Sequence, residues 1–151
     1  MNYQADGVTE EFEVAVVPPL GSMFALLEAA RNVQAKVEAA LESVGLSPAK
    51  FQALDALVKA DEPLALSELA GCLKCVRSNI TQLADRLESD GLIKRVDDPS
   101  DRRAVRAVVT PLGAEKHADG ERVIRELQVS VASAVSSSDR EAFLRVLSAL
   151  R

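Results

Sequence analysis

Polar side chains gather over a short stretch in the middle of the chain. Five of the six residues from 77 to 82 can donate or accept hydrogen bonds, and these are Arg77, Ser78, Asn79, Thr81 and Gln82. Guanidinium, amide and hydroxyl groups are the groups with which proteins contact base edges and phosphates in DNA. Polar side chains on a helix are more often simply solvated, so the interpretation depends on the elements that hold them.

One basic residue follows this cluster at a distance of about one helical turn. Arg86 is expected to contact a phosphate rather than to read a base. Pairing of Arg86 with its neighbours Asp85 or Glu88 is the alternative, and the sequence leaves both possibilities open.

Two cysteines precede the polar cluster. Cys72 and Cys75 form a C-x-x-C pair, which in other proteins marks redox chemistry or half of a zinc site. The sequence has no second such pair, and its single histidine, His117, lies far downstream and is given no role. No metal site is therefore predicted. Cys75 is expected to pack inside a turn and Cys72 to be exposed, while a thiol oxidoreductase or redox sensor stays the alternative function.

The hydrophobic pattern predicts three helices before the polar cluster. Apolar residues recur at helical spacing from Met23 to Val44, and Gly45 is expected to end that helix. Ser47 and Pro48 predict the N-cap and first residue of a second helix. Ser67 is expected to cap a third short helix, and a tight turn then leads to the helix that carries the polar residues.

The pattern changes after the polar helix. Residues 92–96 and 104–109 read as two short strands joined by a charged, turn-forming segment, which predicts a β-hairpin. Thr110 is expected to cap a long helix that follows. Ser138 and Glu141 have the spacing of a capping box and predict a last helix. Two short helices with a tight turn form a helix-turn-helix, and the hairpin after them has the place of a wing.

Composition favours helices packed on helices. The chain has 151 residues, of which 48% are hydrophobic and only 3% aromatic, without tryptophan. No apolar stretch approaches the roughly 20 residues needed to span a bilayer, so no membrane partner is expected. Residues 1–19 are acidic, lack the features of a signal peptide and are expected to form a flexible arm. The cytoplasm is the expected compartment.

Charge is unevenly distributed along the chain. The formal net charge is −5, which by itself argues against DNA binding. Residues 74–106 nevertheless carry eight basic and six acidic side chains, a net charge of +2, whereas the rest carries ten and seventeen, a net −7. An acidic body with a mildly basic middle is compatible with DNA binding through one face.

A long run of residues resembles a known family. The segment LSELAGCLKCVRSNITQLADRLESDGLIKRVDDPSDRRAVRAVVTPLG, residues 66–113, is similar to the MarR family, most densely over residues 81–103. The resemblance implies a homodimer whose first and last helices interlock, with recognition helices in the major groove and wings at the minor groove. It also implies a regulator, most often a repressor, that a small molecule or an oxidant releases from DNA.

The resemblance also suggests roles for residues of the wing. Arg102 and Arg103 match arginines that approach the minor groove, with Arg103 favoured, and Asp101 would orient one of them. One position departs from the family pattern. Val76 stands where the family often has a capping Ser or Asp, so Ser78 is an alternative cap that would shift the start of the recognition helix.

These observations together predict a mainly helical winged helix-turn-helix protein with a small hairpin wing. Residues 20–47 would form an N-terminal dimerisation helix, 48–110 the DNA-binding lobe and 111–151 the C-terminal dimerisation helices. The expected partners are double-stranded DNA and a second copy, with a small aromatic or phenolic ligand as the first class to screen. No enzyme activity and no cofactor are expected. A winged helix that serves only protein contacts is the rival binding function.

Overall fold

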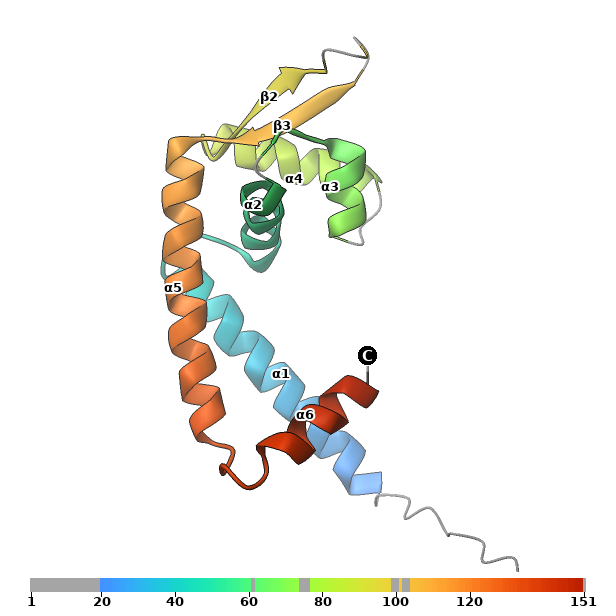
Figure 1. Ribbon diagram of the computed structural model, residues 1–151, viewed down its shortest axis with the longest axis vertical. Coiled ribbons are helices and arrows are strands. Elements are labelled where there is room, and N and C mark those ends of the chain that lie inside the picture. Colours follow the sequence, from blue (N-terminus) through green and yellow to red (C-terminus); the bar gives the residue numbers. More distant parts are fainter. Residues whose placement is uncertain (1–19, 61, 74–76, 99–100, 102–103, 151) are drawn as a thin grey trace, which may run out of the picture. The chain divides into compact units, whose positions relative to one another are not determined.

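The computed structural model covers most of the chain (Figure 1). It describes residues 20–60, 62–73, 77–98, 101 and 104–150. The flexible arm predicted for residues 1–19 lies outside this part of the chain. The chain divides into two units, residues 1–32 and 33–151. In the first unit, residues 20–32 are helical and the side chains of residues 21–32 are exposed to solvent.

Helices dominate the structure, and one small sheet interrupts them. In chain order the elements are α1 (Leu20–Glu42), α2 (Pro48–Ala60), β1 (Leu64–Ala65), α3 (Leu66–Cys72), α4 (Arg77–Ser89), β2 (Ile93–Asp97), β3 (Val105–Val109), α5 (Pro111–Ser133) and α6 (Arg140–Ala149). This order confirms the predicted winged helix-turn-helix fold. None of the described helices is long and apolar enough to cross a membrane.

Two glycines end helices in the same way. Gly45 and Gly91 have φ angles of 78° and 73°, the left-handed conformation that glycine adopts without strain. After α1, the N–H of Leu46 donates to the carbonyl of Leu41 at 3.0 Å. After α4, the N–H of Leu92 donates to Leu87 at 2.9 Å. These bonds satisfy carbonyls that the helix ends leave open. Gly45 thus ends α1 as predicted.

Two of the predicted helix caps are wrong. Ser67 lies inside α3, because the strand β1 ends at Ala65 and the carboxylate of Glu68 accepts the Ala65 N–H at 2.8 Å. The helix therefore begins directly after the strand. Ser138 precedes the N-cap of α6, which is Asp139. Its hydroxyl lies 2.8 Å from that of Ser136, a local turn contact that competes with the predicted capping box.

The sheet contains one strand more than the sequence predicted. Its order is β1-β3-β2 and both pairs are antiparallel, with Arg95 opposite Ala107 in the hairpin and Leu64 opposite Ala107 on the other edge. The strands of the hairpin lie within one residue of their predicted bounds. β1 has only two residues, too few to give an alternating pattern, and it ties the segment before α3 to the wing.

The core of the second unit joins its elements into one lobe. Leu41, Leu54, Leu69, Ile80 and Leu87 are fully buried and come from α1, α2, α3 and α4. Ile93 of the hairpin completes this cluster with 1% exposure. Burial of large aliphatic side chains is the main source of folding free energy. The helix that carries the polar cluster is thus held in place by its opposite, apolar face.

A buried polar contact joins α2 to α5. His117 is only 6% exposed, and its ring stacks on that of Phe51 with centroids 5.4 Å apart. Its Nε2 atom lies 3.1 Å from the carboxylate of Asp55, which also accepts a hydrogen bond from Lys59 at 2.7 Å. Gly120 allows this approach, because a Cβ atom there would lie 2.6 Å from the Phe51 ring. No pattern in the sequence indicated this role for His117.

The end of α4, the hairpin and the start of α5 meet at Thr110. Its hydroxyl donates to the carbonyl of Gly91 at 2.6 Å and accepts the Gly113 N–H at 3.0 Å, which confirms the predicted cap. The Thr110 N–H donates to the carbonyl of Leu92 at 3.0 Å. A single residue therefore links the recognition helix, the wing and the long helix, and we refer to these contacts as the Thr110 junction.

The Thr110 junction predicts the effect of a small substitution. In Gly113→Ala the new Cβ would fall onto the carbonyl oxygen of Leu92, which is backbone and already engaged. We expect a loss of about 2 kcal/mol or more in the free energy of unfolding, measured by urea denaturation. Gly71→Ala in α3 is the matched control, because no described atom outside the helix's own backbone lies within 4 Å of its new Cβ. Equal stability of the two variants would contradict the packing described.

The contact between α2 and α5 predicts a pH dependence. Burial by itself raises the pKa of Asp55, but hydrogen bonds from Lys59 and His117 outweigh it and hold this pKa below its usual value. The stabilisation is therefore present above the pKa of the unfolded chain, about 3.9, and is lost as the pH falls through the lower pKa of the folded state. Asp55→Asn should reduce the free energy of unfolding by about 1 kcal/mol at neutral pH, and this difference should vanish in acid.

A surface ion pair supplies the control for this measurement. Glu126 is 66% exposed and pairs with Arg122 one turn away on α5, at 3.1 Å. Glu126→Gln should change the free energy of unfolding by less than about 0.5 kcal/mol at any pH. The contrary result is an Asp55→Asn variant that is less stable than the wild type by the same amount at every pH, including where the wild-type carboxylate is protonated. That result would contradict a stabilising role for the charged Asp55.

Candidate nucleic-acid interface

The recognition helix α4 has one buried and one exposed face. Ile80, Ala84 and Leu87 are fully buried against the core of the lobe. Asn79 and Gln82 lie on the solvent side and are exposed. Arg77 and Ser78 occupy the first turn of the helix. Because α4 begins at Arg77, residue 78 lies within the helix, and the alternative start with Ser78 as its cap is wrong.

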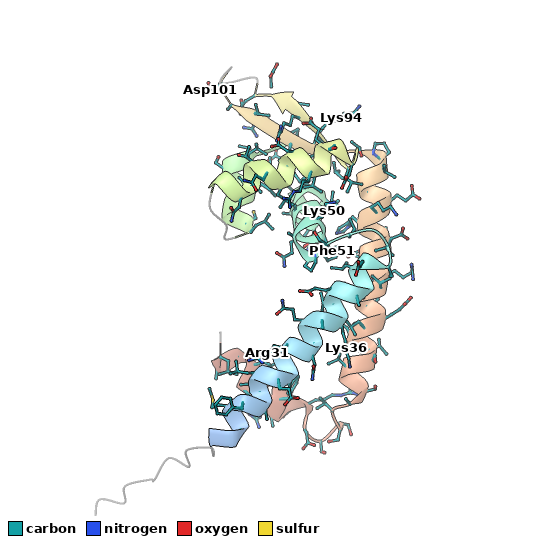
Figure 2. All side chains as sticks on the ribbon, turned by 180° about the vertical axis from the view of Figure 1, so that it is seen from behind. Arg31, Lys36, Lys50, Phe51, Lys94 and Asp101 are labelled. Carbon is teal, nitrogen blue, oxygen red and sulfur yellow. The ribbon has the colours of Figure 1, made fainter. Side chains whose placement is uncertain are left out.

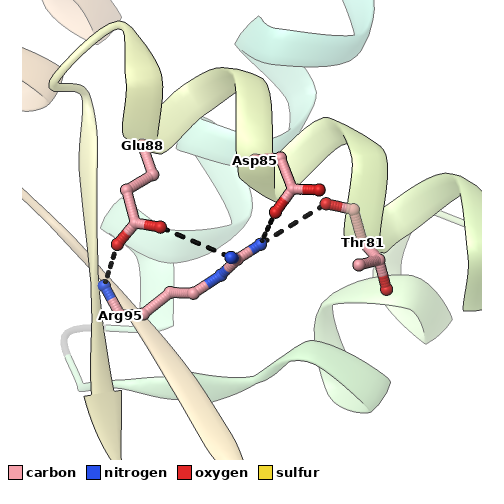
Figure 3. A network of polar contacts seen from close by, with 4 residues as sticks. All are labelled: Thr81, Asp85, Glu88 and Arg95. Atoms are coloured by element: carbon pink, nitrogen blue, oxygen red, sulfur yellow. Dashed lines mark hydrogen bonds and ion pairs between the residues drawn. The ribbon is translucent and has the colours of Figure 1, made fainter.

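Arg95 of β2 takes the acidic neighbours that the sequence offered to Arg86 (Figure 3). One terminal nitrogen of Arg95 lies 2.5 Å from the carboxylate of Asp85, and the other lies 3.4 Å from that of Glu88. Within the described residues Arg86 makes no ion pair, and its side chain is exposed. Of the two alternatives for Arg86, the arrangement favours a guanidinium that is available to an external anion.

Thr81 lies on the flank of α4 that faces the wing. Its backbone carbonyl accepts a hydrogen bond from Arg95 at 3.4 Å. Thr81, Asp85 and Glu88 follow each other at spacings of four and three residues, so they form one stripe along the helix. Gln82 and Arg86 form the next stripe. The exposed surface of α4 is thus divided between a stripe that docks the wing strand and a stripe that faces solvent.

A second ion pair holds the base of the wing. Asp98 directly follows β2 and is 6% exposed. Its carboxylate accepts a hydrogen bond from Nε of Arg106 in β3 at 2.6 Å. This bond raises the pKa of the Arg106 guanidinium, which stays charged. Arg106 also donates to the carbonyl of Pro63 at 3.0 Å. The sequence counted both residues only as charges, because their pairing depends on the register of the hairpin.

Asp101 lies at the end of the hairpin away from α5 (Figure 2). Asp101 is exposed there, and its carbonyl accepts the N–H of Ala104 at 2.9 Å. Lys94 lies on the same hairpin and is also exposed. The two arginines of the sequence prediction, Arg102 and Arg103, lie outside the described residues. Their approach to the minor groove, and their orientation by Asp101, stay predictions.

The sequence and the fold match known proteins over this same region. A model of the MarR family matches residues 44–104. The transcriptional regulators YsmB and YkoM of Bacillus subtilis are each 33% identical, over 58% and 68% of this chain. The structure of the transcriptional repressor CouR, bound to a 23-mer DNA duplex, is 28% identical with a TM-score of 0.74, over 87% of this chain and 92% of that one.

The chain belongs to the MarR family. Its matches span 54% of the length of YsmB and 66% of YkoM, about half to two thirds of these curated relatives. The family model covers α2, α3, α4 and β2, the first strand of the hairpin, and it ends just before β3. The predicted resemblance is therefore confirmed.

Of the two cysteines considered for thiol chemistry in this MarR-family chain, only Cys72 lies among the described residues. Cys72 at the end of α3 is a free, exposed thiol, as predicted. Cys75 lies outside the described residues, so its packing in the turn stays a prediction. Among the described residues, no three His, Cys, Asp or Glu side chains converge in a way that would hold a metal ion.

Proposed function

We propose that this chain is a sequence-specific, double-stranded DNA-binding transcriptional regulator that acts as a homodimer. The observation that carries the proposal is the exposed polar stripe of α4, backed by a fully buried apolar face and followed directly by a wing. A helix presented in this way fits the major groove of B-DNA. The relative CouR, whose structure is described as a repressor bound to a DNA duplex, supports the same use of the fold.

The interface assigns different tasks to its residues. Arg77, Ser78, Asn79, Thr81 and Gln82 would contact base edges and neighbouring phosphates from the first turns of α4. Arg86, exposed one turn further on, would bind a phosphate. Arg102 and Arg103 would reach the minor groove, whose negative potential attracts guanidinium groups. The proposal assigns no catalytic activity and no cofactor, and it places the protein in the cytoplasm.

The apolar surface at the C-terminal end supports a dimer. α6 has no buried residue: its apolar side chains Phe143 and Leu144 are 44% and 61% exposed, and its C-cap Leu150 is 61% exposed. Within the second unit, α6 and the end of α5 line an apolar cavity of about 730 Å³ together with Val33 and Val37 of α1. An apolar surface of this kind marks an interface. We propose that a second copy fills the cavity, with residues 20–47 and 111–151 as dimerisation segments around the lobe of residues 48–110.

The proposed regulatory signal is based on the resemblance to the MarR family and not on a feature of the DNA-binding surface. We propose a repressor that leaves DNA when a small molecule or an oxidant acts on it. Small aromatic and phenolic acids are the ligand class to screen first, by the shift they cause in the melting temperature. Oxidation of Cys72 and Cys75 is the alternative signal. Operator binding that is unchanged after treatment with diamide would exclude it.

Variants of α4 test the proposed division between base and phosphate contacts. Asn79→Ala should weaken operator binding by about 1–3 kcal/mol and relax the sequence preference, as expected for a base contact. Arg86→Ala should weaken binding to all sequences alike and reduce the slope of log affinity against log salt by about one. Fluorescence anisotropy with operator and scrambled duplexes measures both quantities.

Arg122→Ala is the control for loss of a positive charge. Arg122 lies on α5, pairs with Glu126 and belongs to none of the DNA-contacting elements. This variant should leave specificity and salt dependence unchanged. The assignment fails if Asn79→Ala and Arg86→Ala give the same specificity profile.

The proposed dimer predicts the oligomeric state and the form of the operator. Sedimentation at micromolar concentration should give a dimer, and footprinting should show two half-sites about 10 bp apart. Leu144→Glu places a charge in the apolar cavity and should yield monomers. Val105→Glu, at an exposed position of the wing, should remain dimeric. A wild-type monomer, or a single asymmetric half-site, would contradict the proposal.

A further inference from the structure

Arg95 makes several polar contacts to the recognition helix α4. Its Nη2 atom lies 2.5 Å from Asp85 and 3.4 Å from the carbonyl of Thr81, and its Nη1 atom lies 3.4 Å from Glu88. Its backbone N–H donates to Glu88 as well, at 3.1 Å. Figure 3 shows the side chain lying along α4 with both ends of the guanidinium group engaged.

The position of the guanidinium group is set by these carboxylates. The Nε atom of Arg95 is buried and has no hydrogen-bond partner within the described residues. An unpaired buried N–H is unfavourable. The side chain nevertheless adopts this placement, in which its terminal nitrogens meet both acidic side chains of the stripe. Arg95 is thus a cation directed at the carboxylates of α4, although it belongs to the basic middle segment of the sequence.

The carboxylates that Arg95 meets lie beside the surface proposed to bind DNA. Asp85 and Glu88 are 57% and 41% exposed, so both remain close to solvent. They occupy the helix stripe next to Gln82 and Arg86. Without a cation on them, two negative charges would flank the phosphate-binding surface, where like charges repel. Arg86 is the single basic residue on the last two turns of α4 and cannot balance both.

We propose that Arg95 is a positioning residue that neutralises Asp85 and Glu88, so that α4 can approach the phosphates, without itself contacting DNA. The inference rests on the proposed DNA-binding function and deepens it. It assigns the arginine of the wing strand to the electrostatics of the recognition helix. The affinity for DNA then depends on a residue that a count of phosphate contacts would omit.

Removing the cation and then the carboxylates tests this proposal. Arg95→Gln should lower the affinity for the footprinted duplex roughly tenfold at low salt, measured by fluorescence anisotropy. Adding Asp85→Asn and Glu88→Gln to the same chain should restore the affinity to within about threefold of the wild type, because no charge is left to neutralise. Lys94→Gln, the exposed neighbour on β2, is the matched control, and its loss should not be rescued by the two amide substitutions.

Each outcome decides the proposal. An affinity of Arg95→Gln equal to the wild type overturns it, and so does a loss that the amide substitutions do not restore, because Arg95 would then contact DNA or act only on stability. If Arg95→Gln does not fold, Asp85→Asn with Glu88→Gln in the wild-type background decides, since higher affinity supports the proposal and lower affinity overturns it. A wild type without affinity for any duplex removes the proposed function and this inference together.

Discussion

The Thr110 junction is the constraint on which the arrangement of the lobe depends. The hydroxyl of Thr110 bonds to Gly91 at the end of α4 and to Gly113 at the start of α5, and its backbone N–H bonds to Leu92 at the base of the wing. Gly113 leaves no room for a side chain beside Leu92. The recognition helix, the wing and the long helix therefore meet at one residue, which fixes how these three elements are joined.

The positive charge that the lobe presents to solvent depends on which basic side chains are paired with carboxylates, and not only on how many there are. Two arginines of the basic middle segment are directed at carboxylates, Arg95 at those of α4 and Arg106 at Asp98 at the base of the wing. Both pairs fix the hairpin, one to the helix and one to itself. Arg86 and Lys94 remain exposed. A protein with a net charge of −5 can thus still present a surface suited to phosphate.

The sequence predicted correctly those helix ends that depend on bonds between residues close together in the chain. Gly45 and Thr110 end and begin helices through bonds to residues a few positions away, and both were correctly predicted. The partners of His117 and Arg95 are distant in sequence or belong to another element, so no local pattern indicated them. The predicted cap at Ser138 was wrong because neighbouring hydroxyls formed their own turn. The DNA contacts were inferred from residue type and helix position, and they stay predictions for every residue.

The proposed function requires that the exposed stripe of α4 and the wing bind a specific duplex. A gel-shift titration with the DNA upstream of the protein's own gene tests it most directly, in the presence of an excess of unrelated competitor DNA. We expect a discrete complex that survives the competitor and weakens as salt is raised, because phosphate contacts release counterions. A protein that forms no complex, or one that the competitor removes as readily as the labelled fragment itself does, would contradict it.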